Sequence, residues 1–247
     1  MKVQTVCNIL EEFAPLALQE AYDNAGLIVG DPFMEVNGIL ISLDVTMEVL
    51  EEAKRKKCNF ILAHHPLIFN SLKRLVGQNE TERCVIFALK HDLAIYAGHT
   101  NVDNLWNGVN QKIAEKLQLV HTKVLKPLSH QLLKLVTFVP HAHADKVRKA
   151  MFKAGAGSIG NYDSCSYNVE GTGTFKAQEN AHPFVGEHNE FHAEPETRIE
   201  VILPSYLKNS VVNALLQAHP YEEPAYDLIP LENEWNRAGA GLLGNLE

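Results

Sequence analysis

The sequence predicts a mixed α/β fold, with a parallel-sheet core of βαβ units followed by a ferredoxin-like α+β domain. The first observation is that short, uncharged apolar runs over 38–43 and 60–63 flank a helical pattern over 46–57. A strand, a helix and a strand at this spacing form a βαβ unit, in which the two strands are parallel. The second observation is a β-α-β…β-α-β order after residue 127, which is typical of a ferredoxin-like sandwich.

Apolar spacing and turn residues place the other elements of the first half. Val3, Val6 and Leu10 recur at helical spacing, so a helix is expected over 3–13. The segment 22–26, Tyr-Asp-Asn-Ala-Gly, is expected to be a turn, because Asp and Asn side chains bond readily to nearby backbone; a polar lining for a site is the alternative. Further along, we expect a helix over 82–91, a strand over 93–97 and a helix over 109–117.

The second half is predicted to have a core of its own. Its expected elements are a strand over 133–139, a helix over 144–154, irregular strands and an exposed loop over 160–193, a strand over 198–203, a helix over 207–218 and a strand over 226–231. About 100 residues suffice for a separate domain. We therefore expect residues 1–127 to form the N-terminal part of the core, 128–232 the ferredoxin-like domain, and 233–247 the start of a return to the core.

Composition bounds the class of protein. The chain has 247 residues, of which 46% are hydrophobic and 21% charged, as in soluble globular proteins. The formal charge of −8 argues against a broad nucleic-acid-binding surface. The four cysteines form no CxxC pair and are expected to be reduced thiols. No apolar stretch approaches the length of about 20 residues that a membrane span needs, so a cytoplasmic protein is expected.

Two adjacent histidines, His64 and His65, end the apolar run over 60–63. Successive side chains on a strand point to opposite faces, so two histidines share a site only where the strand stops. Pro66 fits such a stop, because it has no N–H for the ladder and disfavours the helical conformation at His65. The pair therefore indicates metal ligands, with capping or surface histidines as the alternative.

A second strand end supports the metal hypothesis. His99 and Asp103 follow the strand expected over 93–97. Ligands collect at the carboxyl ends of the strands in open α/β sheets, and this strand is expected to lie beside the one that ends at His64. The alternative for Asp103 is a helix N-cap for the helix over 109–117.

Several motifs resemble one known family. In the first half these are Asp23–Leu27, Leu43–Thr46, Ala63–Phe69 (Ala-His-His-Pro-Leu-Ile-Phe) and His99–Asp103. They resemble the GTP cyclohydrolase I type 2 homologues, also called NGG-interacting-factor-like proteins. In the second half, the segments 155–162, 171–175 and 219–227 resemble the insert of the longer members, which is similar to the PII and CutA regulators. The resemblance covers nearly the whole chain.

The resemblance implies an α/β core with two divalent metal ions per subunit and a homohexameric ring. It places metal ligands at His64, His65 and Asp103, and puts His99 in or just outside the ligand set. Family members also take a His and a Glu from a Gly-His…Thr-Glu segment near their C-terminus, and this chain has no such segment.

Two functions follow as hypotheses. The first is a hydrolase in which divalent Zn, Fe, Mn or Co ions activate water for attack on a nucleotide-like substrate. The second is a non-catalytic metal-binding regulatory or scaffold protein, in which the PII-like insert senses a ligand or partner. The sequence assigns no general acid or base. Glu222 and Glu223 lie between prolines in an expected loop, where a structural role is favoured.

Overall fold

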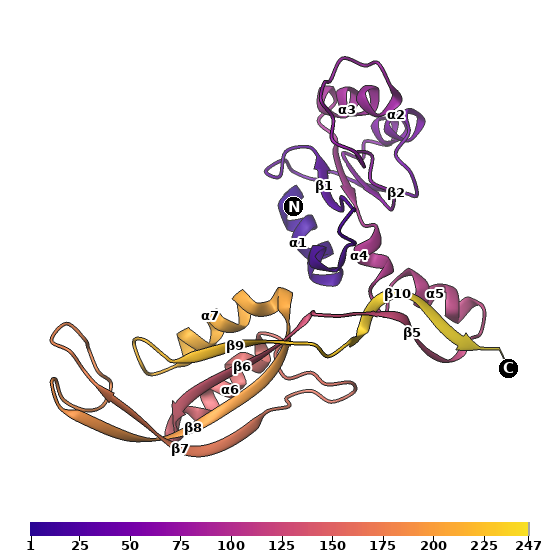
Figure 1. Ribbon diagram of the computed structural model, residues 1–247. Helices are drawn as coiled ribbons and strands as arrows, with labels where there is room; N and C mark the ends of the chain where they lie inside the picture. The colour runs from indigo at the N-terminus through magenta and orange to yellow at the C-terminus, as the bar shows by residue number, and fades with distance from the viewer. Residues whose placement is uncertain (247) are drawn as a thin grey trace. The chain divides into compact units, whose positions relative to one another are not determined.

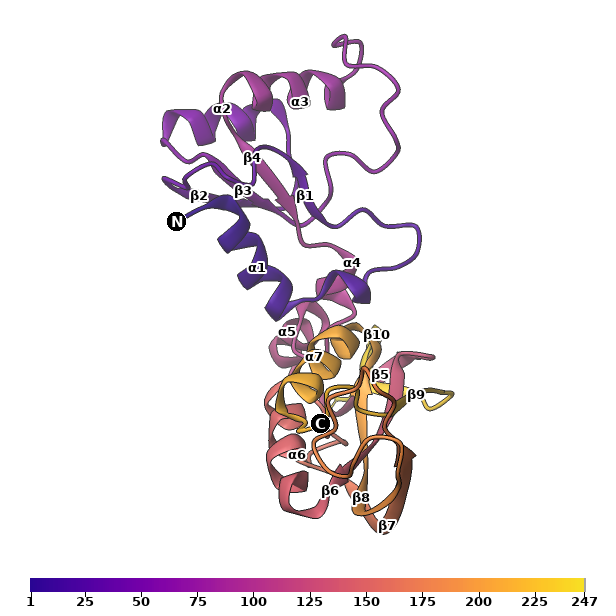
Figure 2. The ribbon, with the colours of Figure 1, turned by 90° about the vertical axis from the view of Figure 1, so that its left-hand side faces the viewer.

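The computed structural model describes residues 1–246, which form two compact units (Figures 1 and 2). The first unit comprises Met1–Pro127 together with residues 237–246, and the second comprises Leu128–Asn236. Both units combine helices with β-sheets, so the mixed α/β class is confirmed. All four cysteines are free. Among the described residues, no helix is long and apolar enough to cross a membrane.

The first unit is built on a four-stranded sheet with the order β1-β4-β3-β2. Its strands are β1 (Gly26–Val29), β2 (Ile39–Ser42), β3 (Phe60–Ala63) and β4 (Ala94–Ala97). The β2–β3 and β3–β4 pairs are parallel, whereas β1 pairs antiparallel with β4. The expected parallel core is thus confirmed in part. The sequence-based prediction lacks β1, because this short strand follows directly on the turn signal of residues 22–26.

Helices cover both faces of this sheet (Figure 2). They are α1 (Val3–Phe13), α2 (Met47–Arg55) and α3 (Glu80–Lys90). Because side chains alternate along a strand, Phe60 of β3 packs with α1 while its neighbour Ile61 packs with α2 and α3. In β4, Tyr96 packs on the α1 side of the sheet and Ile95 packs on the side of α2 and α3. Burial of each such side chain contributes roughly 1.5–3 kcal/mol and fixes the position of both strand ends.

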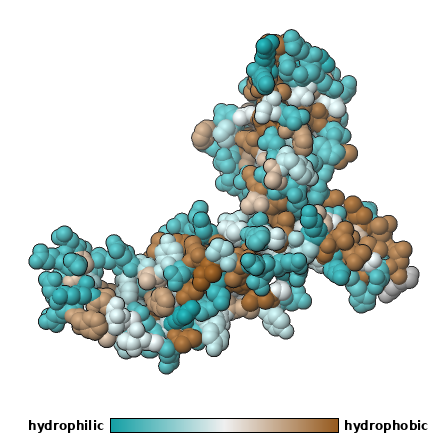
Figure 3. Space-filling model, viewed as in Figure 1, coloured by the Kyte–Doolittle hydropathy of each residue, from teal (hydrophilic) through white to brown (hydrophobic). Residues whose placement is uncertain are grey.

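The sheet leads into a short helix and a two-stranded ribbon. The elements are the 3-10 turn η1 (Leu16–Leu18), α4 (Thr100–Asp103), α5 (Val109–Lys116), β5 (Val120–Leu128) and β10 (Trp235–Asn245), of which the last two pair with each other. Asp103 lies inside α4, and the N-cap of α5 is Gly108, so the capping alternative for Asp103 is wrong. Neither ribbon strand is predicted, because their residues lack a regular apolar alternation. Apolar side chains are exposed over this region (Figure 3), among them Ile113, Leu117, Leu125 and Leu243.

The second unit has the element order βαββαβ. Its elements are β6 (Leu132–Pro140), η2 (His141–His143), α6 (Ala144–Lys153), β7 (Tyr167–Lys176), β8 (Phe191–Pro204), η3 (Ser205–Leu207), α7 (Lys208–Ala218) and β9 (Tyr226–Leu231). The antiparallel sheet has the order β7-β8-β6-β9. The helices α6 and α7 pack on one face of it, through a core that includes Leu135, Val147, Ile199 and Leu215.

One long strand of this sheet differs from the prediction. Residues 160–193 were expected to hold irregular strands, but β7 is a regular ten-residue strand paired along its length with β8. Most of its side chains are exposed, and two of its residues are glycines, Gly171 and Gly173. The strand therefore carries no alternating apolar pattern, and its regularity comes from backbone pairing with β8.

We predict that Gly30→Ala destabilises the first unit. Gly30 has a φ of +117°, and a Cβ there would lie 2.7 Å from the Ala94 Cα of β4. Backbone strain and steric overlap should lower the free energy of unfolding by about 2–4 kcal/mol, measured by urea titration. Gly77→Ala is the control: Gly77 also has a positive φ, of +77°, but a Cβ there meets nothing closer than 3.8 Å. Equal losses in the two variants would show that the approach to β4 does not matter.

Candidate metal centre

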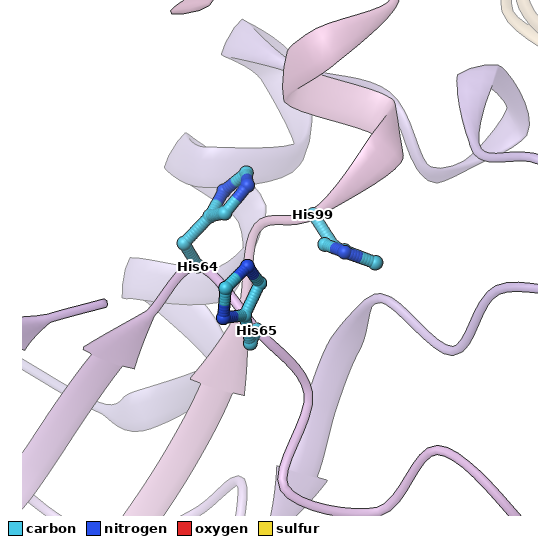
Figure 4. A group of neighbouring side chains, drawn as sticks. All are labelled: His64, His65 and His99. Atoms are coloured by element: carbon cyan, nitrogen blue, oxygen red, sulfur yellow. The ribbon is translucent and has the colours of Figure 1, made fainter. Parts of the chain in front are cut away.

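Three histidines meet at the carboxyl edge of the first sheet. His64 and His65 follow β3 directly, and His99 follows β4 after one intervening residue. The strands are parallel neighbours in which Ala63 pairs with Ala97, so their carboxyl ends lie side by side. The ring centroids are 5.0, 5.3 and 5.6 Å apart (Figure 4). One ligand atom from each ring lies within 4.8 Å of those from the other two, close enough for one metal ion.

The backbone holds the histidine pair in place. The N–H of His64 donates to the Ser42 carbonyl oxygen at 3.2 Å, and that of His65 donates to the Leu43 carbonyl oxygen at 2.9 Å. These bonds extend the β2–β3 ladder past the end of β3. Both residues are thus fixed by β2 even though the chain turns away at Pro66.

In each of the three imidazoles, Nδ1 forms a hydrogen bond to a carbonyl or carboxylate oxygen, which can only accept. His64 Nδ1 donates to the Gly98 carbonyl oxygen at 2.8 Å, and His65 Nδ1 donates to Asp44 Oδ1 at 2.7 Å. His99 Nδ1 donates to Asp23 Oδ1 at 2.7 Å. The Nδ1 proton is therefore used in all three rings, and Nε2 is left with its lone pair. Metal-binding histidines have this arrangement, because the second bond fixes the tautomer and orients the ring.

The Asp23 carboxylate is the most enclosed of these anchors, with a side chain that is 0% exposed. Burial alone raises the pKa of Asp23, but hydrogen bonds from the side chains of Thr100 and His99 and from the backbone of Asn24 and Thr100 outweigh it and hold the pKa below its usual value. The Thr100 N–H donates at 3.0 Å, and the Thr100 hydroxyl also donates to Oδ2. Asp23 is thus a fixed anion behind His99.

Asp103 lies beside the three histidines. Its Oδ1 is 3.8 Å from His64 Nε2, and its side chain is 33% exposed. The sequence-based ligand set was His64, His65 and Asp103, with His99 close by. The structure brings His99 into the group of three and places Asp103 next to His64. All four residues lie at one edge of the sheet, and which of them bind a metal stays a prediction.

The sequence-based reasoning does not assign two carboxylates to this site. It favours a turn over a site lining for Asp23, and it interprets Asp44 as the end of a strand. No local pattern pairs Asp23 with His99, because the two residues are 76 positions apart. Asp44 offers a weak signal, since it ends the strand next to the one that delivers His65.

Aromatic rings border the histidines. The Phe69 ring lies 6.4 Å from the His99 ring and also 6.4 Å from the Tyr22 ring. Phe69 is 48% exposed and Tyr22 is 64% exposed, so both present ring surface to solvent. Asn24 connects their segments, because its Nδ2 donates to the Ile68 carbonyl oxygen at 2.6 Å.

Comparison with known proteins gives one consistent family. The model of the family Duf34/NIF3 (NGG1p interacting factor 3) matches residues 1–240. Proteins named GTP cyclohydrolase 1 type 2 homolog are 44% identical over 244 residues in Halalkalibacterium halodurans and 40% identical over 245 residues in Bacillus subtilis. These alignments cover 98% and 99% of this chain and 66% of each relative.

A solved structure agrees with the sequence comparisons. The crystal structure of a Bacillus cereus protein related to NIF3 superposes with a TM-score of 0.86 at 42% identity. It covers 99% of this chain, while the chain covers 65% of the B. cereus protein. The chain therefore spans about two thirds of the length of its relatives.

Proposed function

The chain belongs to the Duf34/NIF3 family, and from this premise we propose that it is a divalent-metal-binding protein and a metal-dependent hydrolase of a nucleotide-like substrate. The observation that carries the proposal is the group of three imidazoles whose Nδ1 atoms are all occupied. A surface cluster of histidines needs no such anchoring. A metal site does, because its ligands must present their lone pairs together.

The donor atoms fit a divalent transition metal. His64, His65 and His99 would hold the ion, with Asp103 as an additional ligand beside His64. Imidazole with carboxylate suits Zn, Fe, Mn or Co, and two ions per subunit are expected from the family resemblance. When bound, such an ion supplies a Lewis acid and makes water a stronger nucleophile. Asp23, Asp44 and the Gly98 carbonyl hold the Nδ1 protons in place, so Nε2 is the atom that each ring would offer to an ion.

The rim of the site supports a substrate that contains a planar ring. Tyr22 and Phe69 expose aromatic surface beside His99, and nucleobases stack on such rings. The relatives are named as GTP cyclohydrolase 1 type 2 homologs, which also favours a nucleotide-like substrate. The substrate would lie with its base on the aromatic rim and its reacting bond toward the histidines.

The test is a turnover screen of the purified protein with nucleoside triphosphates, each assayed with Zn, Mn, Fe and Co. We expect product formation that requires metal, that a chelator abolishes, and that His64→Ala removes. Metal binding without turnover of any nucleotide would contradict the hydrolase and support the second candidate, a non-catalytic regulatory or scaffold protein. The separate second unit, with a cavity of its own, is the observation that favours this candidate.

We predict that the carboxylates of Asp23 and Asp44 position the ligands. Asp23→Asn and Asp44→Asn should each lower the affinity for zinc about 10–100-fold, because an amide anchors the imidazole less strongly and fixes its tautomer poorly. A competition titration with a chromophoric chelator measures the affinity. Asp92→Asn is the control, since Asp92 precedes the opposite end of β4 and its φ of 52° suits Asn. Unchanged affinity in both test variants would show that these carboxylates do not position the ligands.

We also propose that the chain is cytoplasmic and that its second unit is a PII/CutA-like domain. We further propose that the chain associates with itself, as a hexamer in the family arrangement. The apolar side chains exposed on α5, β5 and β10 support self-association, because a second copy of the chain could bury them (Figure 3). Light scattering after size-exclusion chromatography tests this. A monomer at all concentrations would contradict it.

A further inference from the structure

The second unit contains a cavity on the face of its sheet that α6 and α7 leave uncovered. Along β8, Ile199 and Val201 pack against the helices, so Glu196 and Arg198 point to the opposite face. There they line a cavity of about 610 Å³, which residues of the segments 181–184 and 221–225 border. This volume is in the range of small-molecule sites.

A buried carboxylate lies in this cavity without a cation beside it. Glu196 is 7% exposed, and its Oε1 accepts a hydrogen bond from the Tyr221 hydroxyl at 2.8 Å. No Lys, Arg or His of the described chain forms an ion pair with it. Arg198, the one Lys or Arg among the lining residues, has its guanidinium 2.8 Å from Glu200. Buried charges are normally paired with a charge of opposite sign, and the Glu196 carboxylate has no such counter-charge in the described chain.

The imidazole of His219, which lies against the Tyr221 ring, does not supply the missing charge. His219 Nδ1 accepts the Tyr221 N–H at 3.1 Å, so this nitrogen carries no proton. The other nitrogen, Nε2, donates to the Phe138 carbonyl oxygen at 3.0 Å. The ring is therefore neutral. Burial lowers the pKa of His219 and outweighs the opposing effects of this hydrogen bond and of Glu196.

Two glycines of β7 make room for the carboxylate and for a ligand. A Cβ at Gly173 would lie 2.1 Å from Glu196 Oε2, so any side chain there would displace the carboxylate. A Cβ at Gly171 would meet no atom within 4 Å, although Gly171 lines the cavity. The first glycine thus lets Glu196 lie across β7, and the second leaves open space beside it.

Aromatic rings complete the walls. Phe175 and Phe184 each lie 6.3 Å from the Tyr221 ring, and Phe138 also lines the cavity. The faces of aromatic rings attract cations and exclude water. Proteins therefore bind organic cations in pockets whose walls are aromatic rings. Glu170, Glu222 and Glu223 also line the cavity, but the described residues bring no three His, Cys, Asp or Glu ligand atoms together there as a Ca²⁺ or Mg²⁺ site needs.

We propose that this cavity binds a small organic cation, in which an ammonium or guanidinium group meets Glu196 and an apolar body lies against the aromatic rings. The cation is a free amine or the side chain of a Lys or Arg in a peptide. The proposal rests on the second unit alone and is independent of the metal centre.

Calorimetric titration of the full chain with benzylamine and with benzyl alcohol tests the charge requirement. The two probes have nearly the same shape, so we expect saturable binding of the amine and at least about tenfold weaker binding of the alcohol. A capped tripeptide with a central lysine separates the two sources: binding as tight as that of benzylamine indicates a protein side chain, and weaker binding indicates a free amine. Equal binding of amine and alcohol, or no saturation by either cationic probe at millimolar concentration, would overturn the proposal.

Two variants test the site itself. Glu196→Gln keeps an acceptor for the Tyr221 hydroxyl but removes the charge, and should weaken amine binding about tenfold or more. Gly171→Val fills the open space opposite Glu196 on the neighbouring strand and keeps the carboxylate, so it should also weaken amine binding. It tests the site independently of the folding of Glu196→Gln. Glu187→Gln, which removes an exposed carboxylate that does not line the cavity, is the control. Wild-type affinity in a folded Glu196→Gln or Gly171→Val protein would refute the assignment.

Discussion

Replacing either His64 or His65 by alanine is expected to lower the affinity for zinc by more than about a hundredfold. Loss of a ligand removes a metal–nitrogen bond, whereas loss of a residue that only orients a ligand costs about 10–100-fold. Chelator competition gives the affinity, and elemental analysis gives the stoichiometry. His130→Asn is the control, because it removes an imidazole of the second unit at a φ of 57° that Asn tolerates.

The same titration separates two possible ligand sets. In one, His64, His65 and Asp103 bind the ion and His99 only supports them; in the other, the three histidines bind it. Asp103→Asn should reduce affinity more than His99→Ala in the first case and less in the second. A variant of His64 or His65 with wild-type affinity and stoichiometry would contradict both sets.

The second large effect concerns the core of the second unit. Leu135→Ala and Leu215→Ala should each lower its free energy of unfolding by about 2–5 kcal/mol, since both side chains are fully buried between the helices and the sheet. Urea unfolding followed by circular dichroism measures the change. Leu216→Ala is the matched control on α7, because Leu216 is 40% exposed and its loss should cost less than about 1 kcal/mol.

We also expect the segment 128–236 to unfold cooperatively when it is expressed alone. The sequence places such a domain at 128–232, and the structure gives residues 128–236 a core of their own. A broad, non-cooperative transition in the isolated segment would contradict an independent domain. The bounds matter for the experiment, because β10 begins at Trp235, whose ring lies 6.0 Å from that of Tyr206.

The strands that carry the histidines are predictable because they are buried on both faces. Phe60–Ala63 is an uninterrupted apolar run that ends at His64, so both its position and its end follow from the sequence. Strand β7 has the opposite character. Its side chains are mostly exposed, and partner pairing alone makes it regular. A pattern of buried residues cannot reveal a strand that buries few of them.

The residues of the candidate site also differ in how well the sequence reveals them. His64 and His65 are visible in the sequence because two ligands occur together at a strand end. Asp23 is ambiguous, because the Asp-Asn-Ala-Gly segment fits an ordinary turn as well as a polar lining for a site. Only the antiparallel pairing of β1 with β4, in which Gly26 lies opposite Ala97, places Asp23 beside His99.

The ribbon of β5 and β10 determines how the second unit is attached. A Cβ at Gly239 would lie 2.1 Å from the Lys126 carbonyl oxygen and 2.8 Å from the Pro127 Cα, so the chain leaves the first unit and returns to it at neighbouring points. Joined by a tight turn instead, the two strands would form an ordinary β-hairpin with little added loop-closure entropy. We therefore expect that a gene in which the codons for the second unit are replaced by those of a short turn, or of another domain with adjacent termini, still encodes a folded histidine-bearing sheet.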